Sequence, residues 1–270
     1  MHDLHCHTNL SACAKRESTL GVMIGALKAA GVSVAGIANH LWDSGVPGSS
    51  GWYAPQNVEH VRSIRAEYDA LSPGERSGIK LYFGCETEYV GQGRVALKEE
   101  HAPLFDFVLV PPHHFHMKDF VRPAELEDAA KIRKLIFERF LECCAIPFVF
   151  GLAHPLMVLG YPGRVDEILS GFRDNEYREL FSAAAERKKS VEINICALFQ
   201  ETRRDGDGLP AEYVRMMTVA RECGCRFHLG SDAHDTARLA KERFEFALRF
   251  AESAGSSSPR IPCSRNGEPK

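Results

Sequence analysis

Short apolar runs alternate with longer amphipathic segments along most of the chain. Seven runs have the length and composition of buried strands, at 4–6, 34–38, 79–83, 105–110, 148–152, 191–195 and 227–229. The segments between them predict helices, at 18–30, 57–71, 123–144, 174–188, 210–222 and 235–252. Ser18 and Asn57 can cap two of these helices, and Gly31 can end the first.

Alternating strand and helix units build a parallel sheet, and seven strands in one domain favour a closed or nearly closed barrel. The predicted fold class is therefore α/β, a seven-stranded (β/α)7 TIM-like barrel. A doubly wound open sheet is the alternative, but it would gather its site at one switch point. Residues 1–254 show no composition break, which predicts a single domain. Residues 255–270 are polar and contain proline, which predicts a disordered tail.

Side chains with metal-binding chemistry follow nearly every predicted strand. They are six histidines and two carboxylates: His5, His7, His40, His113, His154, His234, Glu86 and Asp232. Barrels of this type carry their active site at the carboxyl ends of the strands. Imidazole and carboxylate together suit zinc, iron or manganese. Since a catalytic zinc takes about three protein ligands, so large a set predicts two or three divalent ions.

The other histidines keep the ordinary interpretation of hydrogen-bonded core or surface residues. His114 competes with its neighbour for a ligand role, and we favour His113.

Composition narrows the class of protein further. The 270 residues are 44% hydrophobic with a formal net charge of −3, so a nucleic-acid partner is not favoured. No apolar run approaches the ~18–20 residues of a membrane span, and we expect no secretory leader. Nine scattered cysteines do not suggest a disulfide framework and fit a reducing cytoplasm. We therefore expect a cytoplasmic protein without a membrane partner, and the oligomeric state stays open.

The order of these motifs resembles the polymerase-and-histidinol-phosphatase (PHP) superfamily of metal-dependent phosphoesterases. The motifs are Asp3-Leu4-His5-Cys6-His7-Thr8 with Ser11, Ile37-Ala38-Asn39-His40, Gly84-Cys85-Glu86, Asp106 through His113, His154-Pro155, Glu192-Ile193-Asn194 and Gly230-Ser231-Asp232-Ala233-His234. Each motif alone is weak evidence for the superfamily, but seven motifs in this order are specific to it. The resemblance covers the chain to about Glu252, and it implies a distorted seven-stranded βα barrel that holds three divalent ions.

The resemblance also implies which residues hold each ion. His5, His7, Glu86 and Asp232 would hold one ion, and Glu86 would bridge it to a second ion held by His113 and His154. His40 and His234 would hold the third.

The chain departs from the family pattern at several positions. Cys13 stands where a histidine or aspartate often completes the third site, and it is either a thiolate ligand suited to zinc or a non-ligand. Asn39 replaces the usual aspartate before the second-motif histidine. Phe199 occupies the place of an arginine, so Arg203 and Arg204 become the candidates for binding the substrate phosphate. The alternative for that pair is a solvated run of loop charges.

The expected function is hydrolysis of a small phosphomonoester, similar to histidinol phosphate, by a metal-activated hydroxide. Asp232 or His234 would assist proton transfer to the leaving oxygen. The alternatives are a nucleotide or oligonucleotide phosphoesterase or exonuclease of the same fold, a non-catalytic metal-binding domain, and hydrolysis of a non-phosphate ester or amide.

Overall fold

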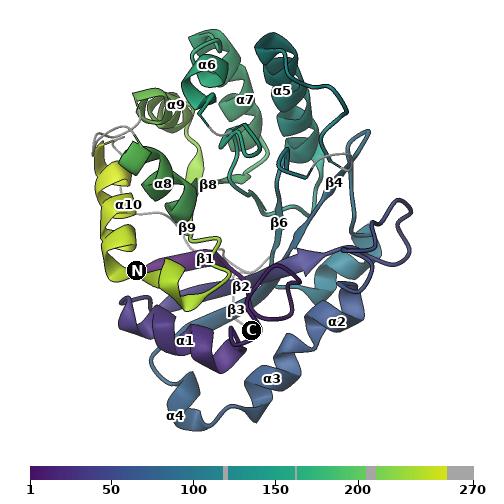
Figure 1. Ribbon diagram of the computed structural model, residues 1–270, viewed down its shortest axis with the longest axis vertical. Coiled ribbons are helices and arrows are strands. Elements are labelled where there is room, and N and C mark those ends of the chain that lie inside the picture. Colours follow the sequence, from purple (N-terminus) through teal and green to yellow (C-terminus); the bar gives the residue numbers. More distant parts are fainter. Residues whose placement is uncertain (118–120, 162, 205–210, 254–270) are drawn as a thin grey trace.

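A computed structural model describes residues 1–253 except 118–120, 162 and 205–210, and for residues 200–204 it describes the backbone alone. Its centre is a seven-stranded parallel sheet that curves into a nearly closed barrel, with helices around the outside (Figure 1). The strands follow the order β1 (His2–Cys6), β2 (Val34–Leu41), β3 (Lys80–Thr87), β6 (Val108–Val110), β7 (Gly151–Leu152), β8 (Ser190–Asn194) and β9 (Arg226–Gly230). The predicted fold class and strand count of the barrel are confirmed.

The two ends of the sheet meet beside the first and last motifs. The backbone N–H of His7 donates to the carbonyl of Ala233 at 2.9 Å, and that of Asp232 donates to the carbonyl of His5 at 2.6 Å. These bonds bring residues more than 220 positions apart in the sequence to the same end of the barrel.

Helices cover the barrel on two sides in Figure 1. Near its lower edge lie α1 (Leu20–Ala29), α2 (Val58–Arg62), α3 (Ile64–Ala70) and α4 (Pro73–Arg76). Along the upper and left sides of the view lie α5 (Ala129–Ala145), α6 (Val165–Leu169), α7 (Asp174–Glu186), α8 (Ile195–Arg204), α9 (Ala211–Glu222) and α10 (Lys241–Ser253). Two 3-10 helices, η1 (Glu99–Leu104) and η2 (Thr236–Leu239), and an antiparallel ribbon of β4 (Tyr89–Gly91) and β5 (Arg94–Val95) complete the described elements.

A small apolar cluster fills the barrel interior. It consists of Ala38, Phe107, Leu109 and Ala153, all buried. Gly36 of β2 and Gly84 of β3 make room for the Phe107 ring, because a Cβ atom on either glycine would lie within 2.6 Å of it. The larger core lies between the barrel and the helices.

Several element bounds differ from the sequence-based expectation. The helix predicted from Pro123 begins at Ala129, because the side chain of Asp128 caps it by accepting the Lys131 N–H at 2.8 Å. The predicted helix over 57–71 is two helices joined at Ser63. Helix α8 was not predicted. The proposed tail from 255 to 270 lies outside the described residues.

Strands β2 and β3 are longer than predicted, and this difference matters for function. His40 and Glu86 lie inside these strands and are register partners. The two side chains are therefore positioned by regular backbone pairing rather than by loops.

Candidate metal centre

His5 and His7 bring two imidazoles together at the end of β1. Both residues are fully buried, and their Nε2 atoms lie 3.1 Å apart. Alternate residues of a strand share a face, so the His-x-His spacing directs both rings into the barrel. Two ring nitrogens at this distance repel each other unless one carries a proton or a cation lies between them.

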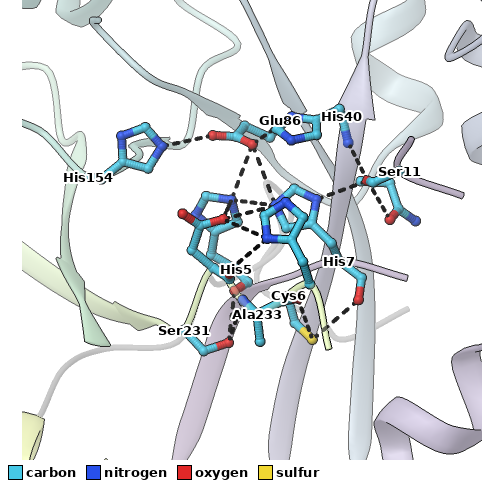
Figure 2. A network of polar contacts seen from close by, with 12 residues as sticks. His5, Cys6, His7, Ser11, His40, Glu86, His154, Ser231 and Ala233 are labelled. Atoms are coloured by element: carbon cyan, nitrogen blue, oxygen red, sulfur yellow. Dashed lines mark hydrogen bonds and ion pairs between the residues drawn. The ribbon is translucent and has the colours of Figure 1, made fainter. Parts of the chain in front are cut away.

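Glu86 lies at the centre of the cluster (Figure 2). Its Oε2 atom is 3.3 Å from Nε2 of His5, 3.5 Å from Nε2 of His7 and 2.9 Å from Nδ1 of His40. Its Oε1 atom is 3.1 Å from Nε2 of His154. The two carboxylate oxygens therefore face different groups of histidines, as a bridging ligand requires.

His114, rather than His113, reaches this cluster. Nε2 of His114 lies 3.1 Å from Nε2 of His154 and 3.5 Å from Oε1 of Glu86. His113 is also buried, but its Nε2 accepts the backbone N–H of Leu156 at 3.0 Å and its ring stacks on Phe115. The sequence-based preference for His113 as the residue near Glu86 and His154 is therefore corrected, since the backbone directs the two side chains apart.

Asp232 and His234 close the cluster on the side that solvent reaches. Oδ1 of Asp232 lies 3.3 Å from Nε2 of His7, and the His234 ring stacks on the His7 ring with centroids 4.1 Å apart. Their side chains are 21% and 16% exposed, whereas those of His5, His7 and Glu86 are 1% exposed or less. A substrate can therefore approach from the Asp232 and His234 side.

The backbone at two of the candidate ligands adopts the left-handed region. His154 has a φ of 30° and Asp232 a φ of 53°, values that non-glycine residues seldom adopt. Such conformations persist where the surrounding structure enforces them, and they concentrate at functional sites.

Within the described part of the chain, the side chains form three groups whose ligand atoms are close enough to share an ion. The groups are His5, His7 and Asp232; Glu86, His114 and His154; and His7, His40 and His234. Histidine nitrogens and carboxylate oxygens are the donor set that zinc, iron and manganese accept. Oε2 of Glu86 is buried and close to the ring nitrogens of His5 and His40, yet none of these contacts has the geometry of a hydrogen bond, and this fits an oxygen that would bind a cation.

The charges of the cluster shift the pKa values of its members. Burial would raise the pKa of Glu86, but His5 and His40 hold it well below its usual range. Burial, with the charges of His234 and His40, lowers the pKa of His7 well below its usual range. Burial would lower the pKa of His5, but the charges of Glu192, Glu86 and Asp232 raise it well above the usual value. At neutral pH the carboxylates are ionised, so a divalent cation would replace the proton that His5 otherwise holds.

A second layer of polar residues holds the ligands in place. Nδ1 of His5 lies 2.9 Å from Oε1 of Glu192, whose other oxygen accepts the backbone N–H of His154. Such carboxylate–histidine pairs fix the ring tautomer in metal sites. The sequence placed Glu192 in a motif but assigned it no role. A carboxylate within an apolar strand was the signal that could have indicated a buried partner for a ligand.

Ser11 and Asn39 support His7 and His40 in the same way. The Ser11 hydroxyl is 2.9 Å from Nδ1 of His7, donates to Oδ1 of Asn39 at 2.9 Å and accepts the His40 N–H at 3.0 Å. Oδ1 of Asn39 also accepts the N–H of Thr8 at 2.8 Å. The Asn39 amide nitrogen in turn donates to the Thr8 hydroxyl at 3.0 Å, a bond that an ionised aspartate could not make.

Cys13 is exposed at the edge of the centre, and His234 and His40 are the neighbouring residues that act on its thiol. Partial enclosure would raise the pKa of this thiol, but the two histidines lower it to about 6. Arg203 and Arg204 fall in the last turn of α8, where the structure describes only the backbone. Their proposed contact with substrate therefore lies outside the described side chains.

These features define a TIM-like barrel with a buried histidine–carboxylate centre, and solved structures share its fold. Histidinol phosphate phosphatase from Lactococcus lactis, complexed with Zn, L-histidinol and phosphate, aligns over 96% of this chain and 95% of its own, with a TM-score of 0.59 and 16% identity. A protein of Listeria monocytogenes named for the same activity aligns over 91% of this chain and 100% of its own, with a TM-score of 0.65 and 14% identity. The resemblance drawn from the motifs is thus confirmed at the level of the fold.

No family model and no curated protein sequence matches the chain. Among the described residues, no helix is both long and apolar enough to cross a membrane.

Proposed function

We propose that this protein is a metal-dependent phosphoesterase that hydrolyses a small phosphomonoester of the histidinol-phosphate type. The observation that carries the proposal is the convergence of three ligand groups around the two oxygens of Glu86. The shared fold with a zinc-containing histidinol phosphate phosphatase supports it.

The three groups would hold two or three divalent ions. When bound, the ions supply positive charge for the phosphoryl oxygens and acidify a water molecule. Glu86 would contribute one oxygen to each of two groups. His114, rather than His113, would be the ligand beside Glu86 and His154. We further propose the cytoplasm as the location of the protein.

The exposed side of the centre would receive the substrate. Burial would raise the pKa values of Glu86 and Asp232, but the neighbouring histidines hold both well below their usual range, so Asp232 suits a ligand or base better than an acid. His234 is the remaining candidate for proton donation to the leaving oxygen, a role open to its ring when the group that it forms with His7 and His40 holds no ion. The Trp52 ring, 37% exposed and 5.4 Å from the His40 ring, would form an aromatic wall beside the reacting group.

A substrate panel with metal analysis tests the proposal. Protein purified without added metal should contain two to three ions per chain and release inorganic phosphate from histidinol phosphate and similar small phosphomonoesters. A chelator should abolish the activity, and zinc, iron or manganese should restore it. Loss of a residue that merely supports a metal ligand typically weakens metal binding by about 10–100-fold, so Glu86→Gln, which changes a ligand itself, should weaken it at least as much. The exposed Glu245→Gln should behave as wild type.

Other outcomes separate the alternatives. Activity confined to oligonucleotides would replace the small-molecule substrate with a nucleic acid. Metal binding without hydrolysis of any phosphoester would leave a non-catalytic metal-binding domain.

A further inference from the structure

Glu88 is a buried carboxylate next to the metal centre that none of the sequence motifs assigns. It follows β3, two residues after Glu86, and is fully buried. Its Oε1 atom accepts a hydrogen bond from the Tyr53 hydroxyl at 2.5 Å and another from Nδ1 of His114. An ionised carboxylate can only accept hydrogen bonds, so Tyr53 and His114 are both donors to Glu88.

The bond from His114 determines which ring nitrogen can bind a cation. Because Nδ1 donates its proton to Glu88, the lone pair of the neutral ring is on Nε2. That Nε2 atom is the one that faces Oε1 of Glu86 and Nε2 of His154. In the opposite tautomer Nε2 would carry a proton and could not act as a ligand.

Tyr53 fixes the carboxylate from the other side. Its side chain is fully buried, and its ring packs against Trp42. Burial and the charge of Glu88 raise the pKa of the Tyr53 hydroxyl well above its usual value, so it remains a donor. The chain Tyr53–Glu88–His114 therefore joins the loop that bears Trp52 to the cluster around Glu86.

We propose that Glu88 is a positioning residue of the metal centre, which holds His114 with the Nε2 lone pair directed at the ion shared with Glu86 and His154. The inference rests on the metal centre of the proposed function. It is independent of the substrate, because Glu88 acts through the ring of His114 and not on the reacting atoms.

The test compares Glu88→Gln with a matched control, Glu142→Gln. Glu142 also accepts a hydrogen bond from a tyrosine hydroxyl, that of Tyr89, but its contacts lie outside the metal centre. Zinc or cobalt affinity is measured by competition with a chromophoric chelator, and the melting temperature is measured with and without metal. Glu88→Gln should weaken the binding of one ion by about 10–100-fold, the effect of losing a supporting carboxylate. Glu142→Gln should leave the affinity unchanged.

A double-variant cycle separates positioning from a general loss of stability. In a His114→Ala background, Glu88→Gln should have little further effect on metal affinity, because the residue through which it acts is already absent. Full additivity of the two losses, or unchanged affinity in a folded Glu88→Gln protein, would overturn the proposal. If Glu88→Gln does not fold, Tyr53→Phe is measured in the same cycle. A loss of affinity that disappears in the His114→Ala background supports the proposal, and unchanged affinity contradicts it.

The metal readout keeps this inference distinct from the proposed function. A wild-type protein that binds ions but hydrolyses no phosphoester would refute the function and leave the role of Glu88 to be judged by affinity alone.

Discussion

His113 and His114 are neighbours in the sequence but meet different surroundings in the structure. His114 reaches Glu86 and His154, while His113 accepts the backbone N–H of Leu156, in the loop that follows His154. Both residues are buried, so burial does not distinguish them. Only the direction of each side chain does, and that direction depends on the irregular backbone after β6.

Cys13 is an exposed neighbour of His40 and His234, and we propose that its thiol is a further ligand of the group that these two histidines form with His7. We expect Cys13→Ala to lower the metal content by about one ion per chain, and Cys13→Asp to retain it, since a carboxylate also binds zinc. Elemental analysis of protein purified without added metal measures both.

Cys223→Ala is the matched control, because Cys223 is partly exposed and its thiol donates to the carbonyl of Arg178 in α7, which contributes no candidate ligand. Equal metal content in wild type and Cys13→Ala would show that the thiol is not a ligand.

At the scale of elements, the packing of β2 and β3 against Phe107 sets the position of His40 and Glu86. The Phe107 ring occupies the space that side chains at Gly36 and Gly84 would need. Gly84 precedes Glu86 by two residues on the same strand. A shift of this strand would therefore be transmitted to the carboxylate at the centre of the site.

Gly84→Ala should destabilise the protein by about 1–3 kcal/mol, the usual effect of overpacking a filled core. The added Cβ would lie 2.5 Å from Phe107, and neither the ring nor the strand can move freely. Urea unfolding of the metal-free protein measures the change.

Gly25→Ala in α1 is the opposite case. No atom lies within 4 Å of the position its Cβ would take, so alanine should stabilise the helix by about 0.5–1 kcal/mol. If both substitutions changed the stability in the same direction, the packing argument for Gly84 would be wrong.

At the scale of the whole molecule, the barrel depends on contacts between its first and last strands. Nε2 of His2 in β1 accepts the backbone N–H of Leu229 in β9 at 3.0 Å. Asp3 strengthens the same seam, because its Oδ1 atom accepts the N–H of Ser231 at 2.9 Å. The contacts between β1 and β9 that bring the first and last motifs together therefore include a hydrogen bond accepted by a titratable residue, His2.

Acid should weaken this closure. Burial, with the charge of the chain amino terminus, lowers the pKa of His2 from 6.5 to about 4. Between these two values His2 binds more protons in the unfolded chain than in the folded protein, so the contribution of His2 to stability is complete above pH 6.5 and is lost as the pH falls toward 4. At pH 5 this loss amounts to roughly 2 kcal/mol relative to pH 7.5.

His2→Gln retains an acceptor for Leu229 but cannot be protonated. We expect its free energy of unfolding in the absence of metal to fall less between pH 7.5 and pH 5 than that of wild type. Parallel pH dependence of the two proteins would show that His2 does not link closure to acid.

Much of the fold follows from local properties of the sequence. The periods of apolar residues gave seven parallel strands in the right order, because side-chain alternation and helix amphipathicity are visible within a window of a few residues. Element ends are harder to predict: Pro123 indicates a helix start, but the helix begins six residues later, where Asp128 provides a cap. Helix α8 was missed because a short helix directly after a strand has no hydrophobic pattern distinct from that of the strand.

The sequence by itself determined the chemistry of the site, since histidines and carboxylates at strand ends are a property of residue type and spacing. The tertiary structure alone decided that His114 rather than His113 faces Glu86, that Glu88 and Glu192 hold two of the histidines, and that Asp232 and His234 form the exposed edge. These facts depend on contacts between residues as far apart as His5 and Glu192. Only the closure of the barrel sets such distances, because no local pattern specifies how two distant segments approach each other.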